Sequence, residues 1–337
     1  MILVTGATGL VGSHIVFQLL KKGLEVKAVK RVTSNTASTL KVFSYYDENP
    51  QILFDKIKWV DADLMDVEEV DSLFDDISEV YHCAAMVSFA PKDKKNLLKL
   101  NSGITANLVN ASLRMDVKKF GMISSVAVLD KSQDKETTEA DYWKNNPSVS
   151  VYGISKYMSE MEVWRGVEEG LNAVIVNPSL ILGPGNWSNS SSTLFKTAHK
   201  GMLFYSSGTN GFVDVRDVAK AIIELMDKNI FCQRFILNSE NWPLKKSFAE
   251  MAKALGSKVP HIALSKKLAS VYWRLEWLKS LIFGAQPTVT KETVNTAFSN
   301  TRFNNQKIIN AIGMEFIPVQ KSIEEFSQFY LNDLKKS

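Results

Sequence analysis

The chain has 337 residues, of which 45% are hydrophobic and 23% charged, and its net charge is +4 at neutral pH. This length allows one large α/β unit or a nucleotide-binding domain with a smaller cap, and the near-balanced charge argues against a nucleic-acid partner. The two cysteines and four histidines lack the spacing of a disulfide framework or a metal site, and no apolar run reaches the roughly 18 residues of a membrane span. Because no basic leader precedes the first predicted strand, we expect a cytoplasmic protein.

A glycine-rich turn joins the first predicted strand to the first predicted helix. Residues 2–5 are apolar and mostly β-branched, glycines follow at Gly6, Gly9 and Gly12, and apolar residues then recur at helical spacing over 15–20. Glycine suits each position: Gly6 for the tight turn, Gly9 for backbone approach to a pyrophosphate, and Gly12 for close packing of helix on strand. The helix N-terminus adds unpaired N–H groups. A turn without a ligand is the alternative, and the flanking strand and helix favour a dinucleotide site.

The second predicted strand, residues 24–29, ends in two basic side chains, Lys30 and Arg31. In a dinucleotide-binding sheet this position meets the adenosine ribose: a carboxylate there binds the 2′-hydroxyl of NAD, whereas an arginine accommodates the 2′-phosphate of NADP. No carboxylate stands here, so the sequence favours NADP over NAD. A solvated basic pair at a strand end is the other interpretation. Residues 32–50 are polar and are predicted as a loop.

Strands and helices then alternate as far as residue 178. Further strands are predicted at 57–60, 79–83, 118–123 and 173–176, with helical patterns over 67–74, 93–113 and 149–168. Alternation with short connections predicts a parallel sheet with helices on both faces.

The pattern after residue 178 is mixed. It comprises a turn at 183–185, strands at 212–215 and 235–238, a helix at 216–226, and helical spacing over most of 244–283, 288–297 and 320–335. We therefore expect a dinucleotide-binding domain over 1–178, to which 212–238 returns, and a substrate-binding part over 179–211 and 239–337.

Tyr152 and Lys156 lie four residues apart on a predicted helix and therefore share one face. About one such pair is expected by chance in a lysine-rich chain of this size, but this pair follows strand five, in the half that carries the glycine turn. Because a neighbouring ammonium favours the phenolate, we expect Lys156 to move the pKa of Tyr152 from about 10 towards neutral pH. Ser125 follows the strand at 118–123, at the sheet edge where ligands bind, and can donate a hydrogen bond to a substrate carbonyl oxygen.

A series of motifs resembles the extended short-chain dehydrogenase/reductase family, also called the NAD-dependent epimerase/dehydratase family. The motifs are TGATGLVG at 5–12, DADL at 61–64, HCAA at 82–85, NSGITAN at 101–107, SSVAV at 124–128, YGISK at 152–156, NPSLILGPG at 177–185 and FVDVRDVAKAI at 212–222. The resemblance covers essentially the whole chain. It implies an α/β fold, a Rossmann-type doubly wound parallel sheet with a smaller mixed C-terminal substrate-binding part.

The resemblance also implies a set of site residues. The catalytic residues would be Ser125, Tyr152 and Lys156. The cofactor-binding residues would be Gly6, Thr8, Gly9, Leu10, Val11, Gly12, Lys30, Arg31, Asp63, Leu64, Cys83, Ala84, Ala85, Tyr152, Lys156, Pro178 and Ser179. In this set Asp63 and Leu64 would contact the adenine, and the backbone after Pro178 would line the nicotinamide. Met86, Ser125 and Trp187 would contact substrate, whereas the buried His82 would be structural; no metal ligand is expected.

Departures from the family pattern narrow the reaction. Val126 and Ala127 stand where sugar-nucleotide 4,6-dehydratases carry an Asp-Glu pair, so that dehydration is not expected. Lys30 replaces the acidic residue of relatives that keep NAD tightly bound, which argues against a UDP-galactose-type epimerase. Asn177 and Asp130 stand where many relatives have arginine and glycine, for no reason evident in the sequence.

Within the family, the chain is most similar to the branch of dihydroflavonol 4-reductase-like and 3β-hydroxysteroid dehydrogenase-like proteins. An NADP(H)-dependent oxidoreductase that transfers a hydride to a ketone or aldehyde, or from a secondary alcohol, is therefore predicted. An NAD-dependent sugar-nucleotide epimerase and a non-catalytic dinucleotide-binding sensor or scaffold are the alternatives. The resemblance further implies a homodimer that pairs the helices at 93–113 and 149–168.

Residues 268–283 form an apolar, Trp-rich helix edged by Lys266, Lys267, Arg274 and Lys279. Such a helix can lie on a membrane surface. Packing over the substrate pocket or the core is the commoner role of an apolar helix, and we expect that role here.

Overall fold

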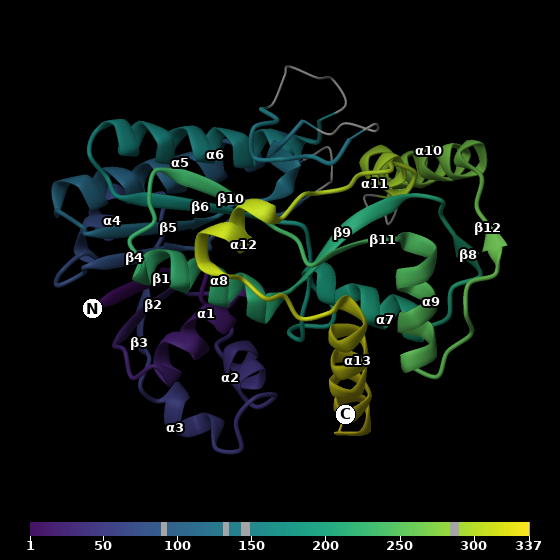
Figure 1. Ribbon diagram of the computed structural model, residues 1–337, viewed down its shortest axis with the longest axis horizontal. Helices are drawn as coiled ribbons and strands as arrows, with labels where there is room; N and C mark the ends of the chain where they lie inside the picture. Colours follow the sequence, from purple (N-terminus) through teal and green to yellow (C-terminus); the bar gives the residue numbers. More distant parts are fainter. Residues whose placement is uncertain (89–92, 131–134, 143–148, 284–289, 337) are drawn as a thin grey trace.

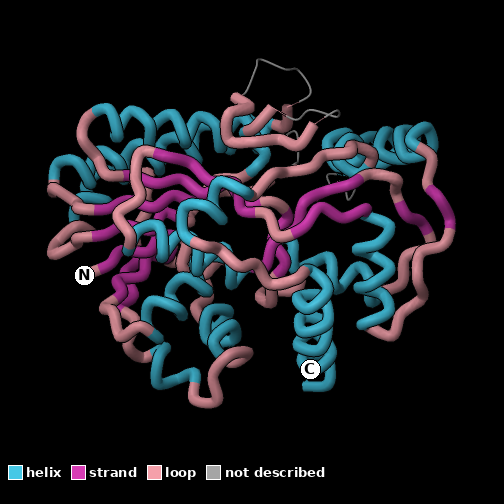
Figure 2. Tube along the Cα trace, in the orientation of Figure 1, coloured by secondary structure: helices cyan, strands magenta, loops and turns pink. Residues whose placement is uncertain are grey.

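The computed structural model describes residues 1–88, 93–130, 135–142, 149–283 and 290–336. Its larger part is a sheet of seven strands with helices on both faces (Figure 1). A smaller part with its own short strands lies beside the sheet, and the C-terminal helix belongs to it (Figure 2).

The seven strands of the large sheet all run parallel. They are β1 (Ile2–Thr5), β2 (Val26–Lys30), β3 (Lys58–Asp61), β4 (Glu79–His82), β5 (Lys119–Ile123), β6 (Ala173–Pro178) and β10 (Gln233–Leu237). Their spatial order is β10-β6-β5-β4-β1-β2-β3, so the direction of winding reverses between β1 and β4. Ligands of open parallel sheets bind outside the carboxyl ends of the strands at this reversal. The predicted Rossmann-type fold is confirmed.

Helices bury two apolar cores, one against each face of the sheet. The helices α1 (Leu10–Lys21) and α8 (Val215–Asp227) cover one face, and α4 (Val67–Ser72), α5 (Lys94–Arg114) and α6 (Val151–Glu168) cover the other. The short helices α2 (Ala37–Phe43), α3 (Pro50–Phe54) and α12 (Gln306–Ile312) complete this part. The helix α2 lies in the region predicted as a loop, and it forms there because Val42 and Phe43 pack into the first core.

The smaller part contains a three-stranded sheet with β9 at its centre. Its strands are β7 (Leu180–Leu182), β9 (Thr209–Asp214) and β11 (Glu240–Pro243), while β8 (Phe204–Tyr205) pairs with β12 (Ile262–Ala263). Its helices are α7 (Thr193–His199), α9 (Leu244–Ala254), α10 (Lys266–Phe283), α11 (Lys291–Ala297) and α13 (Val319–Lys336). Within the stretch 212–238, α8 and β10 pack with the large sheet, whereas β9 belongs to the small one.

The helix α10 differs from the prediction that it packs over the pocket or the core. Its side chains Leu268, Val271, Tyr272, Leu275 and Trp277 are between 47% and 58% exposed. Ala269 is the one side chain of α10 that is buried among those the structure describes. That expectation is therefore wrong for this helix. Among the described residues, no helix has the length and apolar character needed to cross a membrane.

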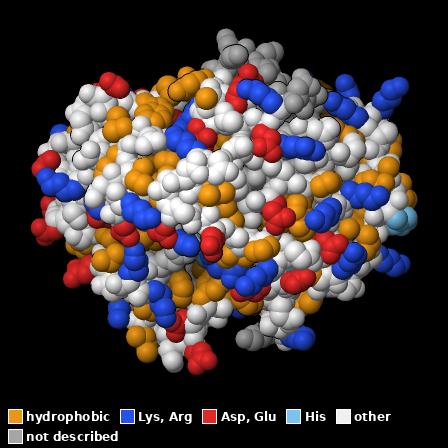
Figure 3. All heavy atoms as spheres, viewed as in Figure 1, with side chains coloured by type: hydrophobic (Ala, Val, Ile, Leu, Met, Phe, Trp, Pro, Cys, Tyr) orange, Lys and Arg blue, Asp and Glu red, His pale blue; other side chains and the backbone are white. Residues whose placement is uncertain are grey.

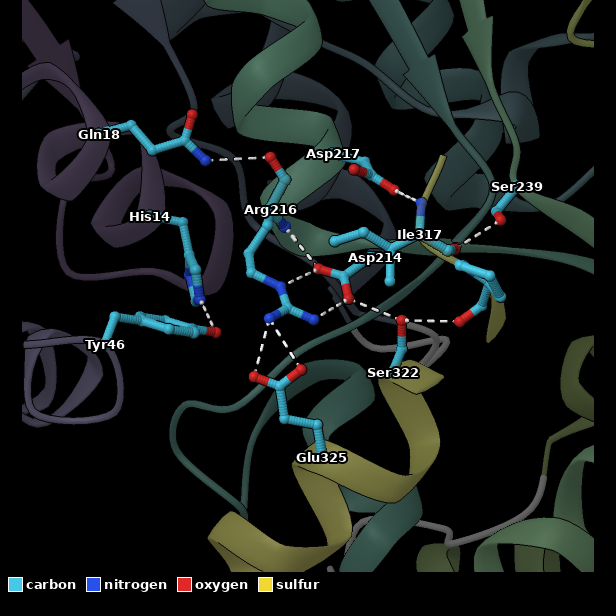
Figure 4. Close-up of polar contacts among 11 residues, drawn as sticks. His14, Gln18, Tyr46, Asp214, Arg216, Asp217, Ser239, Ile317, Ser322 and Glu325 are labelled. Atoms are coloured by element: carbon cyan, nitrogen blue, oxygen red, sulfur yellow. Dashed lines mark hydrogen bonds and ion pairs between the residues drawn. The ribbon is translucent and has the colours of Figure 1, made fainter. Parts of the chain in front are cut away.

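A charged cluster joins the two parts at the start of α8 (Figure 4). Arg216 donates to Asp214 through Nη2 (2.7 Å) and to Glu325 of α13 through Nη1 (2.9 Å). The hydroxyl of Ser322, also on α13, donates to the buried Asp214 carboxylate (2.6 Å). On the other side, Gln18 of α1 donates to the backbone oxygen of Arg216 (3.0 Å). The FVDVRDVA motif therefore fastens the C-terminal helix to the large parallel sheet.

Asp217, one residue further along α8, gives a test of this junction by pH. Its Oδ2 accepts a hydrogen bond from the backbone N–H of Ile317 (2.7 Å), and burial raises its pKa to about 7. The folded state holds this proton more tightly than the unfolded chain, so the stability it contributes is complete below pH 4 and is lost as the pH rises to 7. Asp217→Asn keeps an acceptor oxygen and removes the charge. We expect this variant to melt above wild type at pH 8, with the difference in Tm shrinking towards pH 4.

Thermal unfolding followed by circular dichroism checks this expectation. The exposed Asp75→Asn variant is the control and should show no such pH dependence. A Tm difference for Asp217→Asn that is the same at pH 4 and pH 8 would contradict the raised pKa.

Candidate active site

The turn after β1 requires glycine for reasons visible in its geometry. Gly6 has φ of +65°, and a Cβ there would lie 2.7 Å from the backbone nitrogen of Ala84, at the end of β4. A Cβ on Gly12 would lie 2.2 Å from the backbone oxygen of Gly6. Gly9 precedes α1 and has no side chain to cap the first N–H groups of that helix. The turn therefore has no room for side chains at Gly6 and Gly12, and Thr8 lies within it while Leu10 and Val11 open the helix. Pyrophosphate binding by this turn stays a prediction.

Two basic side chains stand at the end of β2, and one of them is paired with a carboxylate. Lys30 forms an ion pair with Asp61 at the end of β3. Arg31 is exposed, and its guanidinium has no partner among the described residues. Asp63 caps the next turn, where its Oδ1 accepts from the backbone N–H of Met65 (2.9 Å), and Leu64 beside it is buried. A surface hollow lined by Met65, Asn96, Lys99 and Leu100 adjoins this turn.

The residues expected at the nicotinamide end follow β4 and β6. The backbone N–H of Ala84 donates to the hydroxyl of Thr5 (3.2 Å), and Ala85 follows it. Burial raises the pKa of Cys83 to about 12, so this thiol is a neutral filler. After Pro178, the hydroxyl of Ser179 is buried without a hydrogen-bond partner in the described part of the chain. A buried hydroxyl without a partner at the carboxyl end of β6 fits a polar group of a bound dinucleotide.

His82 is structural, as predicted. Its two ring nitrogens bond the hydroxyls of Thr5 (2.9 Å) and Thr105 (3.0 Å). Burial lowers its pKa to about 3, so the ring stays neutral at physiological pH.

Ser125, Tyr152 and Lys156 come together where β5 ends and α6 begins. Ser150 caps α6 by accepting from the backbone N–H of Gly153 (2.9 Å), and a Cβ on Gly153 would lie 2.6 Å from the backbone oxygen of Ala127. This close approach brings the first turn of α6 against the loop after β5. The side chains of Tyr152 and Ser125 lie next to each other there.

The pKa of Tyr152 departs from the sequence-based expectation. Burial raises it to about 12, and the neighbouring Ser125 hydroxyl only partly opposes this. Lys156 is buried one turn further along, and its Nζ donates to the backbone oxygen of Ile123 (2.7 Å). The expected lowering of the Tyr152 pKa is therefore not found in this structure. Burial has the opposite effect on Lys156: it disfavours the charged ammonium and lowers the pKa of this lysine to about 8.

A buried ionic network lies behind these three residues. Glu160, on the same helix as Lys156, is fully buried and raises the pKa of that lysine. Asn177 of β6 donates through its single amide nitrogen to Glu160 Oε1 (2.6 Å) and to the backbone oxygen of Ser125 (3.1 Å). Arg234 of β10 reaches the other carboxylate oxygen of Glu160 (3.4 Å). Asn177 therefore links the buried carboxylate to the backbone at Ser125.

Met86 is held near this site by Asn101 of α5. The side chain of Asn101 accepts from the backbone N–H of Met86 (2.7 Å) and donates to its carbonyl oxygen (3.0 Å). The same amide nitrogen donates to the hydroxyl of Ser155 on α6 (3.0 Å). The loop after β4 is thereby tied to the helix that carries Tyr152.

Trp187, expected to contact substrate, has other partners. Its indole N–H donates to Asp333 of α13 (2.8 Å), and its ring packs edge-on against Phe195 and Tyr330. Asp333 also accepts from Tyr45, which follows α2. None of these contacts is with Ser125, Tyr152 or Lys156.

Comparison with known proteins decides the family. The model of the NAD dependent epimerase/dehydratase family matches residues 2–233, more than half of the chain. The chain belongs to this family. The family-model match confirms the resemblance that the motifs at the glycine turn and at Tyr152 indicated.

Curated relatives and solved structures agree with this membership along the full length. A putative dihydroflavonol 4-reductase of Synechocystis is 24% identical over 336 residues, covering 98% of this chain and 94% of the relative. Cinnamoyl-CoA reductase 1 of Arabidopsis thaliana is 27% identical over 333 residues, covering 95% and 86%. The crystal structure of gox2253 superposes with a TM-score of 0.81 at 27% identity, covering 99% and 98%. A UDP-glucose 4-epimerase of Thermotoga maritima, at 18% identity and a TM-score of 0.78 over 99% of both chains, shares the fold.

Three residues of the site were not identified from the sequence: Asn101, Glu160 and Arg234. Asn101 lies inside the NSGITAN motif, and Glu160 repeats the four-residue spacing of Tyr152 and Lys156, so each had a local signal. Arg234 had none, because it reaches Glu160 only when β10 joins the edge of β6.

The pairing of Arg234 with Glu160 is testable by a double-mutant cycle. Arg234→Met leaves the Glu160 carboxylate buried without its cation, and we expect the free energy of unfolding to fall by about 3 kcal/mol. Glu160→Gln in the same protein removes the stranded charge, so the double variant should lose less than the sum of the single losses. Urea unfolding followed by fluorescence measures all four proteins. Strictly additive losses would contradict the coupling.

Proposed function

We propose that this protein is an NADP(H)-dependent oxidoreductase that transfers a hydride to a ketone or aldehyde, or from a secondary alcohol. The observation that carries the proposal is that Ser125, after β5, lies against the first turn of α6, which carries Tyr152, with Lys156 buried one turn further along. The reductase names of the dihydroflavonol and cinnamoyl-CoA relatives support it. A sensor that only binds a dinucleotide would have no use for an acid–base tyrosine, which argues against the non-catalytic alternative.

The chain's own residues account for the proton. A nicotinamide, when bound, supplies or accepts the hydride. Because its pKa is about 12, Tyr152 keeps its proton at neutral pH and can donate it to a substrate oxygen that gains charge. Ser125 lies next to the same phenol and would hold that oxygen in place. The proton therefore moves from the Tyr152 hydroxyl to the oxygen of the new alcohol.

Lys156 has donors to spare for a cofactor. Of its three N–H groups, one is directed at the backbone oxygen of Ile123. The remaining donors can bind ribose hydroxyls, and a pKa of about 8 keeps the amine largely protonated at neutral pH.

The preference for NADP over NAD rests on Arg31. Lys30 is neutralised by Asp61, whereas the Arg31 guanidinium is exposed at the end of β2. A planar guanidinium binds a phosphate through paired hydrogen bonds. We assign the 2′-phosphate to Arg31 in preference to Lys30. We also propose a homodimer through α5 and α6, where Met158 and Met161 of α6 are exposed.

Tyr152→Phe tests the chemistry. The variant loses the proton donor and keeps the ring, so we expect turnover to fall about 100-fold or more while NADPH affinity changes by less than about twofold. Oxidation of NADPH in the presence of a panel of aldehydes and ketones measures the first, and NADPH fluorescence titration the second. The exposed Tyr272→Phe is the matched control. A Tyr152→Phe enzyme with the turnover of wild type would refute the mechanism.

Arg31→Glu tests the cofactor preference. Replacing the guanidinium by a carboxylate removes the partner of the 2′-phosphate and adds repulsion, so NADPH affinity should fall at least about 10-fold more than NADH affinity. Arg302→Glu, an exposed arginine of the smaller part, controls for the change in net charge. Equal losses for both cofactors in the fluorescence titration would exclude a role for Arg31 at the phosphate.

A further inference from the structure

The end of the smaller part formed by β8, β12 and α10 exposes many apolar side chains. Of the 19 large hydrophobic side chains that are exposed in the described part of the chain, nine lie within residues 203–204 and 259–277. They are Leu203, Phe204, Val259, Ile262, Leu268, Val271, Tyr272, Leu275 and Trp277. The three elements lie together at the right-hand end of the molecule (Figure 1). A large apolar patch on a folded protein marks an interaction site.

The apolar side chains of α10 form a stripe. Leu268, Tyr272 and Leu275 recur at spacings of four and three residues, so they lie along one face of the helix, with Val271 beside them. Ala269, which is buried, points to a different side of the helix. The stripe is therefore a face of α10 that the described part of the chain leaves exposed.

The segment 256–283, which contains α10, carries a charge equal to the net charge of the whole protein. Residues 256–283 contain five basic side chains and one acidic side chain, Glu276, which gives +4, the value of the entire chain. The basic side chains are Lys258, Lys266, Lys267, Arg274 and Lys279, and all five are exposed. Blue and orange spheres accordingly predominate at this end of the space-filling view (Figure 3).

We propose that this surface, made by α10 with the exposed edge of β8 and β12, binds an anionic lipid bilayer. The stripe of Leu268, Tyr272 and Leu275 enters the boundary between headgroups and acyl chains, while Lys267 and Arg274, seven residues apart on one flank of the helix, meet lipid phosphates. Tyrosine and tryptophan suit that boundary because each has an apolar ring and a polar group. The binding needs both components, apolar burial and charge.

The charge distribution argues against a second copy of the chain as the occupant. A two-fold interface places the same patch on both partners, so two surfaces of +4 would face each other. An anionic bilayer instead complements the charge, and it offers an apolar layer directly below the charged one. The proposal does not depend on the reductase chemistry, since α10 carries none of the proposed catalytic residues.

Cosedimentation of the full-length protein with vesicles tests the proposal. Vesicles of phosphatidylcholine alone are compared with vesicles that contain about 30% phosphatidylglycerol, at low and high salt. Wild type should partition at least about 10-fold more strongly to the anionic vesicles at low salt, and high salt should remove most of that preference. Lys266→Glu with Lys267→Glu, and separately Leu268→Ser with Leu275→Ser, should each weaken binding at least about 10-fold.

Matched pairs elsewhere on the surface are the controls. Lys94→Glu with Lys95→Glu, and Ile52→Ser with Val67→Ser, change the same kinds of exposed side chain and should bind as wild type does. Retained NADPH binding and an unchanged Tm show that each variant folds. Wild type that fails to bind anionic vesicles, binds neutral ones equally well, or loses binding in the control pairs overturns the proposal. A fall in solution mass caused by Leu268→Ser with Leu275→Ser would assign the surface to self-association instead.

Discussion

The structure depends on how closely the backbone at Gly6 approaches the end of β4. A side chain of any size at Gly6 would overlap the backbone at Ala84, and one at Gly12 would overlap Gly6 itself. These two contacts fix where α1 begins relative to the central strands. Because all seven strands are parallel, the N-terminus of α1 after β1, Arg31 after β2 and Ser125 after β5 lie along a single edge. This is the edge along which we propose that the dinucleotide binds.

Local patterns were sufficient for the parts of the site that lie close together in sequence. The glycine turn, the Tyr152–Lys156 spacing and the strand end at Ser125 are each encoded within a few residues, and together with the order of motifs they predicted the fold and the family. Trp187 shows the limit. An aromatic residue in a loop after the dinucleotide-binding half is a reasonable substrate contact, yet its indole N–H is taken by a carboxylate 146 residues away. Likewise, periodicity showed that α10 is apolar but not whether anything covers it. Such facts depend on which surfaces meet after folding, and no spacing within one segment records them.

The buried charged groups near Tyr152, which are Lys156, Glu160 and Arg234, stabilise one another. Burial alone would favour neutral lysine, and the carboxylate of Glu160 counteracts that tendency. Glu160 in turn is tolerable in the interior because Asn177 and Arg234 contact its two oxygens. The Asn177 amide also reaches the backbone at Ser125, so the same group that stabilises the carboxylate helps to fix the loop after β5. This gives a role to a residue whose departure from the family pattern had no explanation in the sequence.

The placement of β10 bears on the order in which the protein is completed during synthesis. This strand pairs with β6 in the sheet, but β7, β9 and α8 lie between β6 and β10 in the sequence. A ribosome-bound chain that has emerged as far as residue 178 can form the other six strands, yet β6 then has an open edge and the Glu160 carboxylate lacks its guanidinium. Arg234 is synthesised with β10, after β7 and β9 of the smaller part. The Glu160 carboxylate is therefore paired with its guanidinium late, and an incomplete chain retains an unpaired strand edge, which makes it prone to aggregation.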